Sequence, residues 1–185
     1  MPLRIALLRG VNLGGHKAVK MAALRECLIG LGCDEVQTLL QSGNVVFRGG
    51  RGSGPALERW LEGEVETQLG VRTDIFVRTP EEWEALIEAN PFPAEAKHDP
   101  ARLIAMCFKT RPTSSAVDSL RSAIAGPERI HAVGRELYIV YSNGQGQSRL
   151  TTGLIDSKLG IRGTARNWNT VLKLRALTGA PSARK

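Results

Sequence analysis

A loop near the N-terminus contains residue types that could bind an anion. It runs from Arg9 to Lys20 and joins an apolar run to a helix pattern, so its glycines and the free N–H groups of the helix start favour a phosphate or carboxylate group. Gly10 and Gly15 have the spacing of a phosphate loop, but His16 replaces its lysine, which excludes an ATPase. The loop is therefore either a simple turn or an anion site, with candidate ligands Arg9, Asn12, Lys17 and Lys20.

A second polar cluster lies in a predicted hairpin turn and consists of Gln41, Ser42 and Asn44 around Gly43. Serine, glycine and asparagine are ordinary turn residues, so turn formation alone explains the cluster as well as ligand binding does.

The segment from Ser148 onward is strongly basic, because it holds eight Lys+Arg and one acid, Asp156. An arginine fork suits phosphate or carboxylate, and asparagine adds neutral hydrogen bonds. Trp168 falls on an apolar stripe and is expected in the core. The candidate ligands are Arg149, Arg166, Asn167 and Asn169; the alternative is a solvated basic helix.

The net charge of +7 is unevenly distributed along the chain. Residues 1–100 hold 11 Lys+Arg and 14 Asp+Glu, whereas residues 101–185 hold 14 and 4. Excess positive charge in one half indicates a polyanion or small-anion partner if that charge gathers on one surface.

Other kinds of chemistry lack a pattern in this sequence. The three histidines have no metal-ligand spacing to one another or to cysteine, no serine lies in a nucleophile elbow, and no catalytic residue can be named. We expect no metal and no cofactor. Cys27, Cys33 and Cys107 are expected to be small buried thiols rather than disulfide partners.

Apolar periodicity in the first half predicts the order β, α, β, β, α, β of a ferredoxin-like unit. In its second helix Glu58, Glu62 and Glu66 are expected on a solvated face. Thr79 and Glu82 have the spacing of a capping box that begins a further helix. The predicted elements are strand 4–9, helix 21–31, strands 36–41 and 45–48, helix 57–69 and strand 73–78.

The second half repeats the order with strand 103–108, helix 114–125 and a hairpin of 128–133 and 137–141. Where a closing strand should follow, we expect a final helix from Thr164. The predicted fold class is thus α/β (α+β), with a ferredoxin-like unit, a second, modified ferredoxin-like half and C-terminal helices. The predicted domains are 1–90 and 101–185, joined by a proline-rich connector, 91–100.

The chain has no apolar run long enough to span a membrane and no signal-peptide pattern after Met1. We therefore expect a cytoplasmic protein without a membrane partner.

Three segments, ALLRGVNLGGHKAVKMAAL, LLQSGNVVF and TARNWNTVLKL, resemble the family catalogued as domain of unknown function 1697 over nearly the whole chain. The resemblance implies duplicated ferredoxin-like units and no established activity. Arg149 departs from the family pattern, where lysine is expected. The polar positions that the resemblance implies are Arg9, Gly10, Asn12, Gly14, Gly15, Lys20, Gln41, Ser42, Asn44, Ser148, Arg149, Arg166, Asn167, Trp168, Asn169 and Thr170.

Three functions remain open from the sequence. The first is a binding protein for an anionic ligand, either nucleic acid or a phosphate-containing small molecule. The second is an enzyme acting on a small phosphorylated or carboxylated substrate, with the N-terminal loop and the Arg166 segment in one cleft and His16 as the nearest candidate base. The third is a structural or self-association module, which an exposed apolar sheet face would favour.

Overall fold

The computed structural model describes residues 1–13 and 18–179. Within them the chain forms helices and two four-stranded antiparallel sheets, which confirms the predicted α/β class with duplicated halves. The chain divides into two compact units. The first comprises Met1–Ala85 with the described residues after Leu172, and the second comprises Leu86–Leu172.

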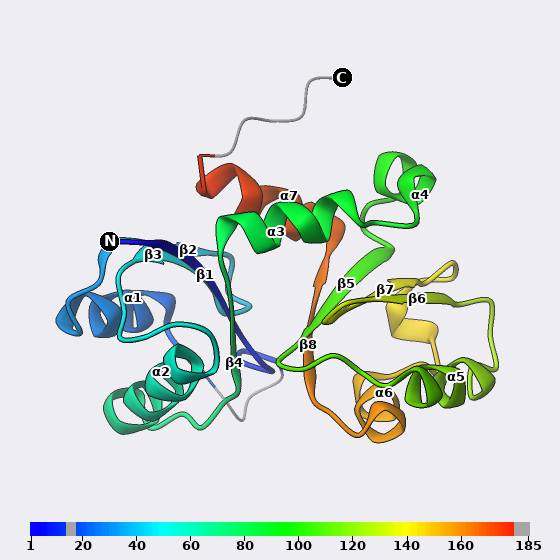
Figure 1. Cartoon of the computed structure of the whole chain (residues 1–185), viewed down its shortest axis with the longest axis horizontal. Coiled ribbons are helices and arrows are strands. Elements are labelled where there is room, and N and C mark those ends of the chain that lie inside the picture. The colour runs from blue at the N-terminus through cyan, green and yellow to red at the C-terminus, as the bar shows by residue number, and fades with distance from the viewer. Residues whose placement is uncertain (14–17, 180–185) are drawn as a thin grey trace. The chain divides into compact units, whose positions relative to one another are not determined.

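The first unit has the predicted ferredoxin-like order, and its sheet has the strand order β2-β3-β1-β4. Helices α1 and α2 cover one face of this sheet (Figure 1). The core between them is formed by alternate strand residues such as Ala6 and Phe47 and by helix residues such as Leu24 and Leu61. The elements are β1 (Leu3–Leu8), α1 (Met21–Gly30), β2 (Asp34–Leu39), β3 (Asn44–Arg48), α2 (Gly54–Leu69) and β4 (Ile75–Arg78).

The prediction that Glu58 lies on a solvated face is wrong. Only 2% of Glu58 is exposed, and its Oε1 accepts a hydrogen bond of 2.9 Å from the backbone N–H of Val77 on β4. One turn along, Glu62 Oε1 accepts 2.8 Å from Ile75 N–H. Because β4 is an edge strand, these N–H groups need acceptors from outside the sheet, and α2 supplies them.

The second unit has the strand order β6-β7-β5-β8, with α5 and α6 on one face of its sheet (Figure 1). Its core again takes alternate residues, including Met106, Phe108, Ile139 and Tyr141. Its elements are α4 (Pro93–His98), β5 (Leu103–Phe108), α5 (Ser114–Ser122), β6 (Arg129–Val133), β7 (Glu136–Val140), a 3-10 turn (Gln145–Gln147), α6 (Thr152–Leu159) and β8 (Gly163–Asn167).

The closing strand of the second unit is present as β8, so the prediction of a helix from Thr164 is wrong. Helix α7 (Trp168–Leu177) begins four residues later. The strand pairs with β5, where Arg166 lies opposite Ala105, at the position that Arg78 takes opposite Ile5 in the first unit. Both arginines are buried. In β4 the apolar residues Ile75, Phe76 and Val77 precede the arginine and mark the strand, whereas β8 (GTARN) has no apolar run that would predict one.

Helix α3 (Pro80–Glu88) begins with the predicted capping box. Glu82 N–H donates 3.2 Å to Thr79 Oγ1, and Thr79 N–H donates 2.9 Å to Glu82 Oε2. Trp83, the fourth residue of this helix, is buried. No helix in the described residues is both long enough and apolar enough to cross a membrane.

Candidate anion-binding groove

The structure brings the two predicted N-terminal polar segments together at one corner of the first unit. Asn12 Nδ2 donates 2.6 Å to Gln41 O and 2.8 Å to Val19 O, and Asn12 Oδ1 accepts 2.8 Å from Val19 N–H. The residue has the left-handed backbone φ of 58°, which asparagine tolerates well. Asn12 thus fastens the loop to the hairpin turn, while Lys17 lies outside the described residues.

The turn itself is built by close packing. Gly43 has φ 73°, and a Cβ there would lie 2.6 Å from Val11 Cγ2 and 2.7 Å from Leu8 Cβ. The buried Asn44 donates 2.9 Å to both Leu39 O and Ser42 Oγ. These contacts support turn formation at the cluster, and a ligand role for Gln41, Ser42 and Asn44 stays a prediction.

Arg9 and Lys20 differ in their surroundings. The Arg9 carbonyl accepts 2.7 Å from Thr73 Oγ1, and Arg9 Nη1 lies 3.9 Å from an Asp74 carboxylate oxygen, so an acid already offsets part of its charge. Lys20 is exposed immediately before α1.

The basic C-terminal candidates also have structural contacts. Arg166 is buried and its Nη1 donates 2.8 Å to Thr164 Oγ1 and 2.8 Å to Ala165 O; burial lowers the pKa of its guanidinium to about 10. Asn167 Oδ1 accepts 3.0 Å from both N–H and Oγ1 of Thr170, which caps α7. Arg149 and Asn169 are exposed. Since the N-terminal candidates belong to the first unit and these to the second, their meeting in one cleft stays a prediction.

Sequence reasoning missed a groove in the second unit, between helix α5 and edge strand β6. Strand β5 ends at Phe108, a short basic loop follows, and Thr113 caps α5 by accepting 3.2 Å from Ala116 N–H. The groove has a volume of about 180 Å³. We call it the α5–β6 groove; its lining is Arg111, Pro112, Ser114, Val117, Asp118, Arg121, His131, Ala132 and Gly134.

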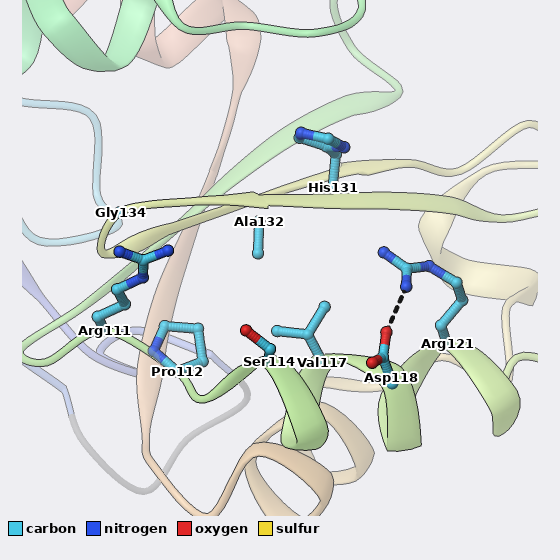
Figure 2. A pocket seen from close by; sticks show the side chains of 9 residues that line it. All are labelled: Arg111, Pro112, Ser114, Val117, Asp118, Arg121, His131, Ala132 and Gly134. Atoms are coloured by element: carbon cyan, nitrogen blue, oxygen red, sulfur yellow. Dashed lines mark hydrogen bonds and ion pairs between the residues drawn. The ribbon is translucent and has the colours of Figure 1, made fainter.

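Figure 2 shows how these side chains are arranged. Arg111 and Arg121 lie at the two ends, and Ala132 points from β6 toward Val117 on the α5 side. His131 lies on the other side of the strand, because successive strand residues face opposite ways. The groove therefore has an apolar middle between two guanidinium groups.

The charge of the groove favours an anion. Asp118 is the only acid in its lining, and its Oδ1 accepts 2.7 Å from Arg121 Nη1. Arg111 is exposed and lies next to the start of α5. The first N–H groups of a helix carry partial positive charge, so Arg111 and the start of α5 both favour an anion at this end of the groove. Within the described residues no group of three His, Cys, Asp or Glu side chains could hold a metal ion.

One signal in the sequence pointed to part of this groove. Thr113 is a helix-capping residue type, and Arg111 precedes it in the connection between a strand and a helix, the same context as the N-terminal loop. The contribution of β6 could not be predicted, because it depends on how α5 packs against that strand.

Comparison with known proteins identifies a family and a fold. The family described as "Protein of unknown function (DUF1697)" matches residues 1–138. The structure of the conserved bacterial protein SP0830 from Streptococcus pneumoniae superposes with a TM-score of 0.71 at 22% identity, covering 95% of this chain and 97% of that one. At this identity the likeness concerns the fold alone. A comparison with curated proteins gives no match.

Proposed function

The chain belongs to the DUF1697 family of proteins of unknown function, and we propose that it binds an anionic ligand in the α5–β6 groove. The observation that carries this proposal is the placement of Arg111 and Arg121 at the two ends of a hollow whose lining holds one acid. A phosphate or carboxylate group accepts charge-assisted hydrogen bonds from arginine, which are about twice as strong as neutral ones.

The size and lining of the groove favour a small anionic group over a nucleic acid. Its volume of about 180 Å³ is below the roughly 300–1,000 Å³ of pockets for drug-sized ligands. Proteins that bind single-stranded nucleic acids combine a positively charged groove with aromatic rings on which bases stack, and the lining contains no Phe, Tyr or Trp. We therefore expect one phosphate or carboxylate group to enter the groove.

The test is titration calorimetry of the full chain with inorganic phosphate, a nucleoside monophosphate and a single-stranded oligonucleotide. Ser114→Asp places a negative charge in the first turn of α5, where an acid stabilises a helix, so the fold should be kept while the anion is repelled. Arg111→Ala removes one guanidinium. The matched control is Lys158→Ala, an exposed cation on α6 that is outside the groove lining.

We expect both groove variants to weaken phosphate binding by about tenfold or more, Arg111→Ala because a hydrogen bond to a charged group is lost and Ser114→Asp because its carboxylate repels the anion. Lys158→Ala should bind as the wild type does. Equal affinity in all variants would overturn the proposal. Tight oligonucleotide binding that survives Ser114→Asp would instead assign the basic charge to a nucleic-acid surface elsewhere.

A further inference from the structure

Three of the four sheet edges in the described residues carry a feature that discourages pairing with another strand. On β4, Glu58 and Glu62 accept the outward N–H groups of Val77 and Ile75. On β8, Gly163 N–H donates 3.2 Å to Asp156 Oδ1 from α6. Side chains of the covering helix thus occupy both edges.

The third edge, β2, is irregular. Its pairing with β3 shifts register between Asp34 and Gln37, and Glu35 in between has φ 49°. Glu35 is held by Arg48, whose Nε lies 2.9 Å from the carboxylate. A bulge of this kind twists an edge and interrupts its row of hydrogen-bonding groups.

The fourth edge, β6, is regular. It pairs with β7 without a shift from Arg129 to Val133, and Val133 and Glu136 close a hairpin of two loop residues. Because the closing pair of such a hairpin is hydrogen-bonded and the pairs then alternate, the N–H and C=O groups of Ile130 and Ala132 point away from β7. Neither N–H has an acceptor in the described part of the chain.

This regular edge borders two hollows that share one lining residue. A second hollow of about 290 Å³ is lined by Glu128, Arg129 and Ile130 and shares Arg121 with the α5–β6 groove. Together the two hollows follow β6 along its length, so an added strand would have room beside both outward-facing residues.

The charge along this edge selects among possible occupants. Arg111, Arg121 and Arg129 line the two hollows, together with the acids Asp118 and Glu128. Asp118 pairs with Arg121 and Glu95 pairs with Arg129, so Arg111 is the arginine of this lining that has no ion pair within the described residues. A second copy of the chain paired antiparallel through β6 would bring Arg111 of one copy and Arg111 of the other to the same added ladder, so like charges would meet along it. An acidic segment would instead meet opposite charge.

We infer that β6 accepts an extended acidic peptide as an added antiparallel or parallel strand, its backbone bonded to Ile130 and Ala132 and its carboxylates directed to Arg111 and Arg121. This inference rests on the proposed anion-binding function, since it names the carrier of the anionic group. Strand addition of this kind derives affinity from main-chain hydrogen bonds and specificity from the flanking side chains.

The probe is a synthetic peptide of alternating Glu and Val, about seven residues long so that it spans the strand. Its controls are the same peptide with Lys in place of Glu, and an N-methylated form that cannot donate backbone hydrogen bonds. Binding to the full chain is measured by titration calorimetry, and amide hydrogen exchange reports on Ile130 and Ala132 directly.

On the protein side, Ala132→Pro removes one outward N–H at an edge position where proline is tolerated. Ala132→Ser is the matched variant that keeps this N–H. We expect the Glu peptide to bind at least about tenfold more tightly than the Lys peptide and to slow exchange at Ile130 and Ala132. N-methylation and Ala132→Pro should each remove binding, and Ala132→Ser should retain it.

The other outcomes distinguish the two proposals. If inorganic phosphate binds in an Arg111-dependent manner and the Glu peptide does not bind, the strand inference falls and the anion site stands. Equal binding of the N-methylated peptide likewise overturns strand addition. Self-association in sedimentation that Ala132→Pro abolishes would assign the edge to a second copy and overturn the peptide, and absence of both phosphate and peptide binding would overturn both proposals.

Discussion

Glu58 on α2 provides the sharpest test of how the first sheet is closed. Its carboxylate is 2% exposed and accepts 2.9 Å from Val77 N–H, so truncation leaves a buried donor on β4 without that acceptor. Loss of a hydrogen bond to a charged group costs about 1.5–3 kcal/mol. We predict that Glu58→Ala lowers the free energy of unfolding by about 2–3 kcal/mol.

Two variants separate the hydrogen bond from other effects. Glu58→Gln keeps an oxygen acceptor and removes a buried charge whose desolvation is itself unfavourable, so it should cost about 1 kcal/mol or less. Glu66→Ala changes an exposed glutamate of the same helix and should stay within about 0.5 kcal/mol of the wild type.

Urea unfolding measures the effect directly. With a slope of about 1–3 kcal/mol per molar urea, the Glu58→Ala midpoint should fall by roughly 1 M, and amide exchange at Val77 should accelerate. If Glu58→Ala unfolded at the same urea concentration as Glu66→Ala and Val77 exchange were unchanged, the carboxylate would have no part in holding the β4 edge.

Three further predictions concern the turn, the loop and the tyrosines. Gly43→Ala combines a φ of 73° with a Cβ 2.6 Å from Val11 and should cost about 2–4 kcal/mol in thermal or urea unfolding, against about 1 kcal/mol for Gly70→Ala, which has φ 67° and open space. Asn12→Asp keeps the acceptor for Val19 N–H and the left-handed preference but loses both donated bonds, so it should destabilise by about 2 kcal/mol, and equal urea midpoints would deny that these bonds matter. Burial raises the pKa of Tyr141 to about 12 and raises that of Tyr138 as well, so tyrosinate absorbance should not rise near pH 10 as it does in the unfolded chain. Because the unfolded state loses these protons first, stability should fall as pH rises from about 10 to about 12; absorbance rising fully near pH 10 in the folded protein would contradict it.

The elements that sequence predicted well are those with a clear apolar period. Helix α1 has apolar residues three and four apart, and strand β1 is a compact apolar run. The capping box of Thr79 and Glu82 is a local pattern of side chain and backbone and was predicted for that reason. Strand β8 lacks that period, because Gly163 and Ala165 are small and Arg166 is buried. Its strand conformation is imposed by pairing with β5, which no local pattern encodes.

The candidate site was less predictable than the fold for a related reason. Asparagines such as Asn12 and Asn167 have the donors and acceptors that a ligand needs, but the same groups fasten a loop and cap a helix. Only tertiary structure decides between these uses. Arg111 and Arg121 border one groove because α5 packs beside β6, and nothing in the nine residues between them indicates this packing.

The two units protect the edge at their fourth strand in the same way and differ at the opposite edge of the sheet. In both, an acidic side chain of the second helix accepts an N–H from the fourth strand: Glu62 for Ile75 and Asp156 for Gly163. The corresponding outer strands differ, since β2 is bulged and β6 is regular. An edge strand left regular keeps its row of outward hydrogen-bonding groups available, at a risk of unwanted pairing that the other three edges avoid. The regular edge is also the one that lies beside the two hollows, so Ala132→Pro, which removes an outward N–H there, should change binding without changing the fold. Variants at Glu58, beside the β4 edge, should change stability without changing binding.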